Sequence, residues 1–355
     1  MTFSNEATAV ELPNLSYLYG QPETTALLRV QPDDFIVHEE LSFTPTGAGE
    51  HMLLLVEKIG QNTQYVAKLL AELAGCKARQ VSYAGLKDRH AVTRQWFCLP
   101  VPIKQQLNWQ QWNIEGVKIL DTIRHQRRLK LGSIKYNEFT LTLREVSDIP
   151  ALLQRLELVK QGVPNYYGEQ RFGIQGGNLR LAEQLFSGSG IEDRKIRGLA
   201  LSASRSFLFN LQVDARVKAG TFNQLLKGEV VQLDGSGSIF KVPEVDETLN
   251  QRLLDADIHP TAGLPGLGEP LITADALEFE QQSLAPWQHW VDKLAQMNVR
   301  AERRSIRVLP ADLQAEAQGN NVKVSFKLYS GCFATSVLRE LVDYQDVQRN
   351  YATLD

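Results

Sequence analysis

The sequence predicts an α+β fold in which a domain with a mixed or antiparallel sheet is interrupted by a helix-rich inserted domain. Strand-like patterns occupy the first part of the chain and return after Ser305, and the segment from Leu179 to Ala219 is mostly helical. A length of 355 residues allows about two or three domains. We therefore expect one domain from residues 1–162 plus 309–355 and an inserted domain from residues 163–308.

The first part of the chain alternates short strands with two helices. Asn62 is a good N-cap for a helix with one apolar face, and Gly75 is suited to end it. A second helix begins at Pro150 and continues through apolar residues to Val159. Strands are expected at residues 27–30, 35–37, 50–58, 96–99, 118–120 and 139–143.

The second part changes character near Gly162. Helices are expected at residues 179–186, 196–217, 286–297 and 333–342, and a short strand within residues 222–233. Residues 255–270 are rich in Gly and Pro and predict a loop. The clean alternation over residues 322–328 predicts a strand.

The composition is that of a soluble globular protein, with 43% hydrophobic and 22% charged residues. No run of about 18 apolar residues occurs, and the N-terminus lacks the pattern of a signal peptide, so we expect a cytoplasmic protein without membrane contact. The three cysteines and six histidines are scattered, which disfavours disulfides and predicts no metal site. Nothing indicates an obligate protein partner, and we expect a monomer.

The net charge of −3 does not by itself indicate a nucleic-acid-binding protein, but the positive charges are clustered. The segment 118–135 holds six Lys or Arg residues against one acid. Two further clusters are Arg194, Lys195, Arg197 and Arg205, and Arg300, Arg303, Arg304 and Arg307. Such clusters form either separate solvated faces or a basic surface that attracts phosphates.

The stretch from Gly85 to Gln95 has the strongest chemical signature. Its single carboxylate, Asp88, is surrounded by Lys87, Arg89, His90 and Arg94. A carboxylate among cations stays ionised at neutral pH, which suits a nucleophile or a proton acceptor rather than a general acid. The structural alternative is a solvated turn whose ion pairs have no catalytic role.

At Gly85-Leu86-Lys87-Asp88-Arg89-His90-Ala91-Val92-Thr93 the sequence resembles the TruD family of tRNA pseudouridine synthases. Four more motifs of that family follow the same order along the chain. They are Pro32-Asp33-Asp34-Phe35-Ile36-Val37, Asn137-Glu138-Phe139, Asn165 to Gly173, and Gly331-Cys332-Phe333-Ala334-Thr335-Ser336, in which Cys332 replaces the Ser expected from the family. The resemblance extends from about Leu15 to Leu341.

This resemblance implies a pseudouridine-synthase-like catalytic domain and an isomerase that converts uridine to pseudouridine in tRNA, at position 13 of the D-arm. The reaction cuts the bond from ribose C1′ to uracil N1 and rejoins the base through C5, so we expect no cofactor. Asp88 either attacks covalently or removes the C2′ proton. The target base must leave its stack to be reached.

The resemblance also implies roles for other residues. Phe139 is expected to stack on the flipped uracil, and Asn137 to hydrogen-bond the nucleotide or to order the Asp88 loop. Phe35 and Phe333 are expected to line the substrate site. Each of these three aromatic residues also fits an ordinary core position.

The expected ion-pair partner of Asp88 is Arg29, with Lys87 as the alternative. RNA backbone contacts are expected from local charge at Arg124, Arg127, Arg128 and Lys130. Arg171 either binds RNA or braces the junction of the two domains.

Two other functions compete with the synthase. A metal-dependent nuclease needs clustered carboxylates, which the Asp88 stretch lacks. A non-catalytic tRNA-binding or RNA-remodelling protein would carry the same basic patches, and it differs in that it would not depend on Asp88.

Overall fold

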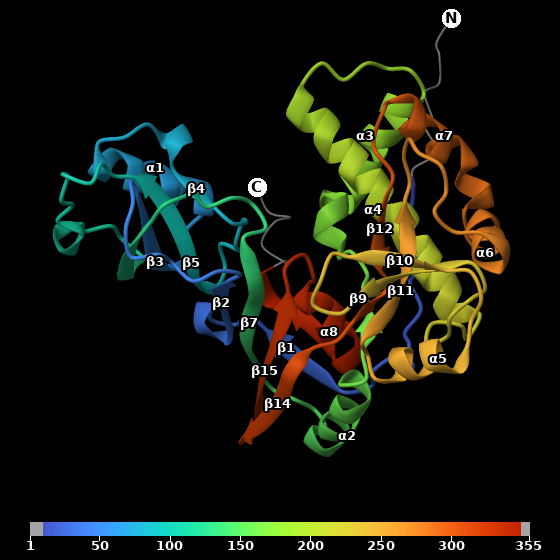
Figure 1. The fold of residues 1–355 in the computed structure, drawn as a ribbon. Coiled ribbons are helices and arrows are strands. Elements are labelled where there is room, and N and C mark those ends of the chain that lie inside the picture. The colour runs from blue at the N-terminus through green and yellow to red at the C-terminus, as the bar shows by residue number, and fades with distance from the viewer. Residues whose placement is uncertain (1–9, 349–355) are drawn as a thin grey trace, which may run out of the picture. The chain divides into compact units, whose positions relative to one another are not determined.

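The computed structural model describes residues 10–348, which form two compact units (Figure 1). The sheet unit consists of Pro22–Gln161 together with residues 309–348, and the helical unit consists of residues 10–21 together with Gly162–Val308. Both units contain helices and strands, and the main sheet is mixed, so the predicted α+β class is confirmed.

The sheet unit is built on an eight-stranded sheet. Strands β2 and β5 run parallel, whereas β3 and β6 pair antiparallel to their neighbours, as do β7, β14 and β15. In spatial order the strands are β14 (Ala311–Gln318), β15 (Asn321–Tyr329), β7 (Ile134–Leu143), β2 (Phe35–Leu41), β5 (Val92–Pro100), β3 (His51–Ile59) and β6 (Val117–His125), with β4 (Ser82–Tyr83) paired to β5.

Three helices and a small parallel pair of strands complete this unit. Helix α1 (Thr63–Ala74) begins where the Asn62 side chain accepts a hydrogen bond from the Gln64 amide and ends at Gly75, whose φ is 67°. Its apolar face covers β3 and β5 and buries Val66 and Leu70 (Figure 1). The remaining elements are α2 (Ile149–Val159), α8 (Ala334–Leu341), and the parallel pair β1 (Thr25–Leu28) and β16 (Asp343–Asp346).

The helical unit has its own core around a long helix, α4 (Arg194–Lys218), which Figure 1 shows beside α3 (Gly177–Phe186). Trp290 and Phe207 are among its buried side chains. Its other helices are α5 (Glu247–Leu254), α6 (Ala274–Leu284) and α7 (Gln288–Gln296). Its strands form a four-stranded sheet, β10 (Ile239–Val242), β9 (Glu229–Leu233), β11 (Ile258–Leu264) and β12 (Glu302–Ser305), and a pair, β13 (Arg307–Val308) with β8 (Val163–Pro164).

Two expectations differ from the structure. The segment predicted as a loop over residues 255–270 contains β11, because this segment pairs with β9 and β12 on its two sides. Residues 10–21 were expected in the sheet unit but pack in the helical unit. The Ser16 amide donates to Asp214 at 2.7 Å, and the Tyr19 hydroxyl donates to the Gly162 carbonyl at 2.8 Å.

Candidate active site

Asp88 lies in the loop between β4 and β5, and both of its carboxylate oxygens are hydrogen-bonded. Oδ1 accepts from the His90 amide at 3.1 Å, and Oδ2 accepts from Arg29 Nη1 at 2.7 Å. The side chain remains 26% exposed. The carboxylate is therefore held in one orientation while part of it stays accessible to a substrate.

Buried polar side chains hold the backbone of this loop. Gln95 donates to the Gly85 carbonyl at 2.7 Å, and the Lys87 amide donates to the Thr63 hydroxyl at 3.0 Å. The Thr63 hydroxyl in turn donates to the Gln95 carboxamide at 3.1 Å. Because Thr63 of α1 and Gln95 of β5 are buried, these hydrogen bonds anchor the loop to α1 and β5. The sequence analysis missed both residues, although polar residues in apolar helix and strand patterns were a signal.

Lys58, at the end of β3, is a further residue that the sequence analysis missed. Its side chain is fully buried, and Nζ donates to the Asp88 carbonyl at 2.9 Å and to the Gln61 carbonyl at 2.8 Å. Burial lowers the pKa of Lys58 to about 8, although Asp88 and Glu39 favour its charged form. Lys58 thus ties the main chain at Asp88 to the sheet.

Arg29 directly follows β1 in the chain, and its side chain contacts Asp88. Its backbone has φ of 60°, a conformation that a residue with a side chain seldom adopts. Nη1 also lies 3.7 Å from Asp346 Oδ2, and the guanidinium lies 4.3 Å from the centre of the Phe35 ring. The alternative partner of Asp88, Lys87, pairs with Glu39 instead.

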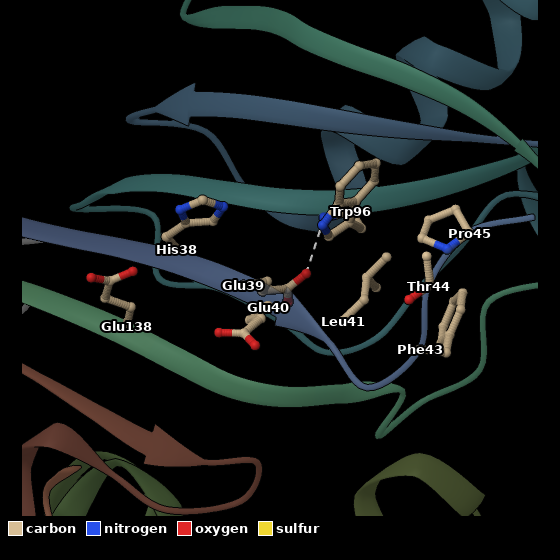
Figure 2. A pocket seen from close by; sticks show the side chains of 9 residues that line it. All are labelled: His38, Glu39, Glu40, Leu41, Phe43, Thr44, Pro45, Trp96 and Glu138. Carbon is tan, nitrogen blue, oxygen red and sulfur yellow. Dashed lines mark hydrogen bonds between the residues drawn. The ribbon is translucent and has the colours of Figure 1, made fainter. Parts of the chain in front are cut away.

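Glu39 lies on β2 just past the point where the pairing of β2 with β5 ends. Strands β2 and β5 pair only from Ile36 to His38, and beyond this point the Glu39 carboxylate accepts from the Trp96 amide at 3.0 Å (Figure 2). A side chain thus satisfies a backbone donor that the adjacent strand does not reach. A pocket of about 340 Å³ adjoins this position, and its lining includes Trp96 and Glu138.

Two of the aromatic residues expected at the substrate site, Phe35 and Phe139, form a buried row with Phe326. Phe35 meets Phe139 edge-on at 6.2 Å, and Phe139 stacks on Phe326 at 5.4 Å. Phe35 and Phe139 are 5% and 7% exposed. Arg29 contacts both Asp88 and the Phe35 ring, so a chain of contacts leads from Asp88 through Arg29 to the aromatic row in the core. Phe139 therefore has a packing role, whatever its role in binding. Phe333 is placed separately, at the N-cap of α8, and is half-buried.

Asn137 lies two residues before Phe139 on β7 and points to the same face of the sheet. It is 8% exposed, and its Oδ1 atom has no hydrogen-bond partner. A buried carbonyl oxygen without a partner costs about 1–3 kcal/mol. Such an atom needs an explanation, and a bound hydrogen-bond donor supplies one.

The basic residues differ in their availability. Arg124 was expected to contact RNA, but its guanidinium donates to the carbonyls of Gly49 and Val101 at 2.9 Å each and to those of Pro102 and Gln105. Arg124 therefore holds loops together, and most of its donors are used within the protein. Arg127, Arg128 and Lys130 are exposed, as are Lys118 and Lys135 of the same segment, and Arg128 also donates to the Arg79 carbonyl at 3.0 Å. Arg171 lies in the helical unit, where it donates to Ser202.

Among residues 10–348, no group of three or more His, Cys, Asp or Glu side chains is arranged to hold a metal ion. Within the same range, no helix combines the length and the apolar character that crossing a membrane requires.

The chain is similar to known proteins over most of its length. The sequence model of the family tRNA pseudouridine synthase D (TruD) matches residues 12–189 and 191–341. The tRNA pseudouridine synthase D of Pseudoalteromonas translucida is 45% identical over 94% of this chain and 95% of its own length, and that of Colwellia psychrerythraea is 45% identical over 94% of each chain. A crystal structure of a Methanosarcina mazei protein assigned to tRNA pseudouridine synthase D superposes with a TM-score of 0.70 at 20% identity, covering 94% of this chain and 95% of that one. The chain therefore belongs to the TruD family of tRNA pseudouridine synthases.

Proposed function

We propose that this protein isomerises uridine to pseudouridine in tRNA, at position 13 of the D-arm, with Asp88 as the nucleophile or base. Membership of the family supports the activity, since relatives that match nearly the whole chain bear the name tRNA pseudouridine synthase D. The observation that carries the proposal is the Asp88 carboxylate, which is oriented by two hydrogen bonds on a clamped loop and remains partly exposed.

The isomerisation needs one ionised carboxylate beside the ribose. The bond from C1′ to N1 breaks, the base turns and C5 bonds to C1′; C5 then loses its proton to water and N1 gains one, so atoms and electrons balance overall. The Arg29 guanidinium at 2.7 Å stabilises the negative charge of Asp88. The carboxylate can then attack C1′ or take the proton from C2′.

Binding of the flipped uridine is assigned to residues of the unit that carries Asp88. Uracil presents an N3–H donor between two carbonyl groups, and the Asn137 Oδ1 atom is a buried acceptor without a partner. Phe35 and Phe139 supply an apolar wall, and Phe333 lines the site from α8. Lys87, next to Asp88 in the same loop, is held in place by its ion pair with Glu39.

Exposed cations of the sheet unit provide contacts for the RNA backbone. Arg127, Arg128 and Lys130 are exposed within one short segment. Phosphate contacts of this kind contribute affinity that falls as salt rises. Replacing all three residues with Gln is expected to weaken tRNA binding and to reduce its salt dependence.

The test of the proposal is tritium release from unmodified tRNA that carries C5-labelled uridine. The wild-type protein should release tritium, and Asp88→Asn, which is nearly isosteric, should release none while it keeps its circular dichroism spectrum and its tRNA affinity. Sequencing of the product then locates the modified uridine. If neither protein releases tritium from a complete tRNA pool, a non-catalytic tRNA-binding protein becomes the better explanation.

A further inference from the structure

The helical unit contains a pocket of about 420 Å³ along one side of α4. Helix α4 lines it with the side chains of Ser202 and Arg205 and with the backbone at Gly198, and Tyr167 and Arg171 approach from the loop after β8. All of these residues lie within the helical unit, which therefore forms the pocket by itself.

Arg171 is fixed in position and oriented for binding. Its guanidinium lies 5.3 Å from the centre of the Tyr167 ring, and Nη1 donates to the Ser202 hydroxyl oxygen at 3.2 Å. A guanidinium has five N–H donors, and a serine that accepts through its oxygen keeps its own O–H to donate. Arg171 and Ser202 together therefore offer several donors and a positive charge, which is the chemistry that binds phosphate.

The charge of the lining is positive overall. Arg205 uses its guanidinium on the carbonyls of Leu264, Pro265 and Arg300 and on the Glu302 carboxylate at 3.1 Å. It supplies charge to the pocket, and its Nε and Nη2 donors are used within the protein. Glu302 is the acidic member of the lining, and its side chain is 59% exposed and thus screened by solvent.

Gly198 is placed within α4, where glycine is less favourable than alanine by about 1 kcal/mol. A Cβ at this position would meet no atom within 4 Å, so packing does not require a glycine here. The absence of a side chain leaves the pocket open on the helix side.

The same face of α4 continues into further exposed cations. Arg194 lies four residues before Gly198 and Lys195 lies three before it, so both lie one turn along the same face. Cations in the first turn of a helix oppose its dipole, by about 0.3–1 kcal/mol each. A negatively charged partner along this face explains both positions.

We propose that this pocket binds a backbone phosphate of the RNA substrate, with Arg171 and Ser202 as its donors and with Arg194 and Lys195 following the strand along α4. The inference rests on the proposed function for the identity of the RNA. An extended partner is favoured over a free nucleotide because the cations continue beyond the pocket.

The first test is a titration of unmodified tRNA by fluorescence anisotropy between about 50 and 200 mM salt. Arg171→Gln should lower the affinity and reduce the slope of log K against log[salt] by about 0.7–0.9, the effect of one lost phosphate contact. Arg252→Gln is the matched control, because Arg252 is a cation of the same unit that is paired with Asp257 outside the pocket. It should leave the slope unchanged.

The second test closes the pocket without changing its charge. Gly198→Leu should weaken tRNA binding, whereas Gly198→Ala should bind as wild type does, since a methyl group has room. An unchanged slope for Arg171→Gln in a protein that releases tritium overturns this inference and leaves the proposed function intact. If the slope is reduced in Arg171→Gln but the wild-type protein releases no tritium, the result supports the phosphate site and counts against the isomerisation. If Arg171→Gln weakens binding of uridine monophosphate but not of tRNA, the pocket is a site for free nucleotides and the inference is wrong.

Discussion

The Arg29 guanidinium donates to the Asp88 carboxylate at 2.7 Å across 59 residues of sequence. Arg29 is almost completely buried, whereas Asp88 is 26% exposed, so the cation belongs to the core and the anion faces outward. The ring of Phe35 below the guanidinium and the carboxylate of Asp346 beside it fix the cation further. The orientation of Asp88 therefore depends on the core.

The first prediction concerns Arg29→Gln, which removes the charge but keeps a hydrogen-bonding group. A hydrogen bond to a charged group contributes about 1.5–3 kcal/mol, so the rate of tritium release should fall roughly ten- to a hundredfold. Arg29→Lys should recover only part of this loss, since an ammonium group lacks the planar fork that fits between Phe35 and Asp88. Single-turnover rates at saturating tRNA measure the effect.

Arg144 provides the matched control for this experiment. Its guanidinium pairs with Asp34 at 2.7 Å within the same unit, and the Asp34 side chain is 2% exposed. Arg144→Gln should lower the melting temperature with little change in the rate of the folded enzyme. Equal losses of rate in both variants would show that Arg29 acts only through stability.

The second prediction is an alkaline decline of activity governed by Lys58. The pKa of Lys58 is lowered to about 8, so above this pH the group that holds the Asp88 carbonyl loses its charge. The charged groups that act on it are Asp88, Lys87 and Glu39. The rate should fall as pH rises through about 8, and Lys58→Arg should move the decline to higher pH. A decline that is the same in Lys58→Arg and wild type would assign it to another group.

The effect of Lys58 on stability has the opposite sign. Its pKa is 10.5 in the unfolded chain and about 8 in the folded protein, so between these values the unfolded chain holds a proton that the folded protein has released. The contribution of Lys58 to the free energy of unfolding therefore rises with pH over this window, by about 3 kcal/mol in total. Urea titrations of wild type and Lys58→Met at pH 7 and pH 10 measure this difference. Activity should fall over the range in which this contribution to stability rises.

The third prediction separates two roles of Phe139. Phe139 and Phe326 stack at 5.4 Å and are both buried, so Phe139→Leu and Phe326→Leu should destabilise the protein by similar amounts. If Phe139 also supports the flipped uracil, only Phe139→Leu should raise the KM for tRNA further. Urea midpoints and steady-state kinetics of both variants give the comparison. Equal kinetic effects would show that Phe139 is a core residue alone.

The fourth prediction concerns the unpartnered oxygen of Asn137. Replacing a buried, unsatisfied polar group with an apolar group of similar shape is nearly neutral or stabilising. Asn137→Leu should therefore unfold at the same or a higher temperature than wild type, yet its tritium release should be at least about tenfold slower. A variant with normal activity would contradict the proposed contact with the nucleotide.

The elements that the sequence predicted well are those with strong local signals. The cap at Asn62 and the stop at Gly75 fixed the limits of α1, and the alternation over residues 322–328 gave β15 to within one residue at each end. The prediction of a loop for the Gly- and Pro-rich segment 255–270 was wrong, because pairing with β9 and β12 overrides its local preference and makes part of it strand β11.

In the candidate site too, features with a local sequence signal were predicted, and most of those that depend on contacts between distant residues were not. Asp88 was evident from its charged neighbours, and Arg29 was named as its partner ahead of Lys87. The support from Lys58 was not evident, because its bond to the Asp88 carbonyl joins residues 30 apart and depends on how β3 lies beside the loop. The role of Arg124 in holding loops together was not evident, because a charge count does not show which cations donate to carbonyl groups of the protein itself.

The pairing of β1 with β16 has a consequence for the order of events during synthesis. Leu28 is in register with Asp346, so β1, the strand that Arg29 follows, finds its parallel partner only after residues 343–346 have left the ribosome. A nascent chain that has already folded its helical unit still lacks the strand that orders Arg29. We expect catalytic competence to arise only after β16 has emerged, and chains that stall before residue 343 to be inactive.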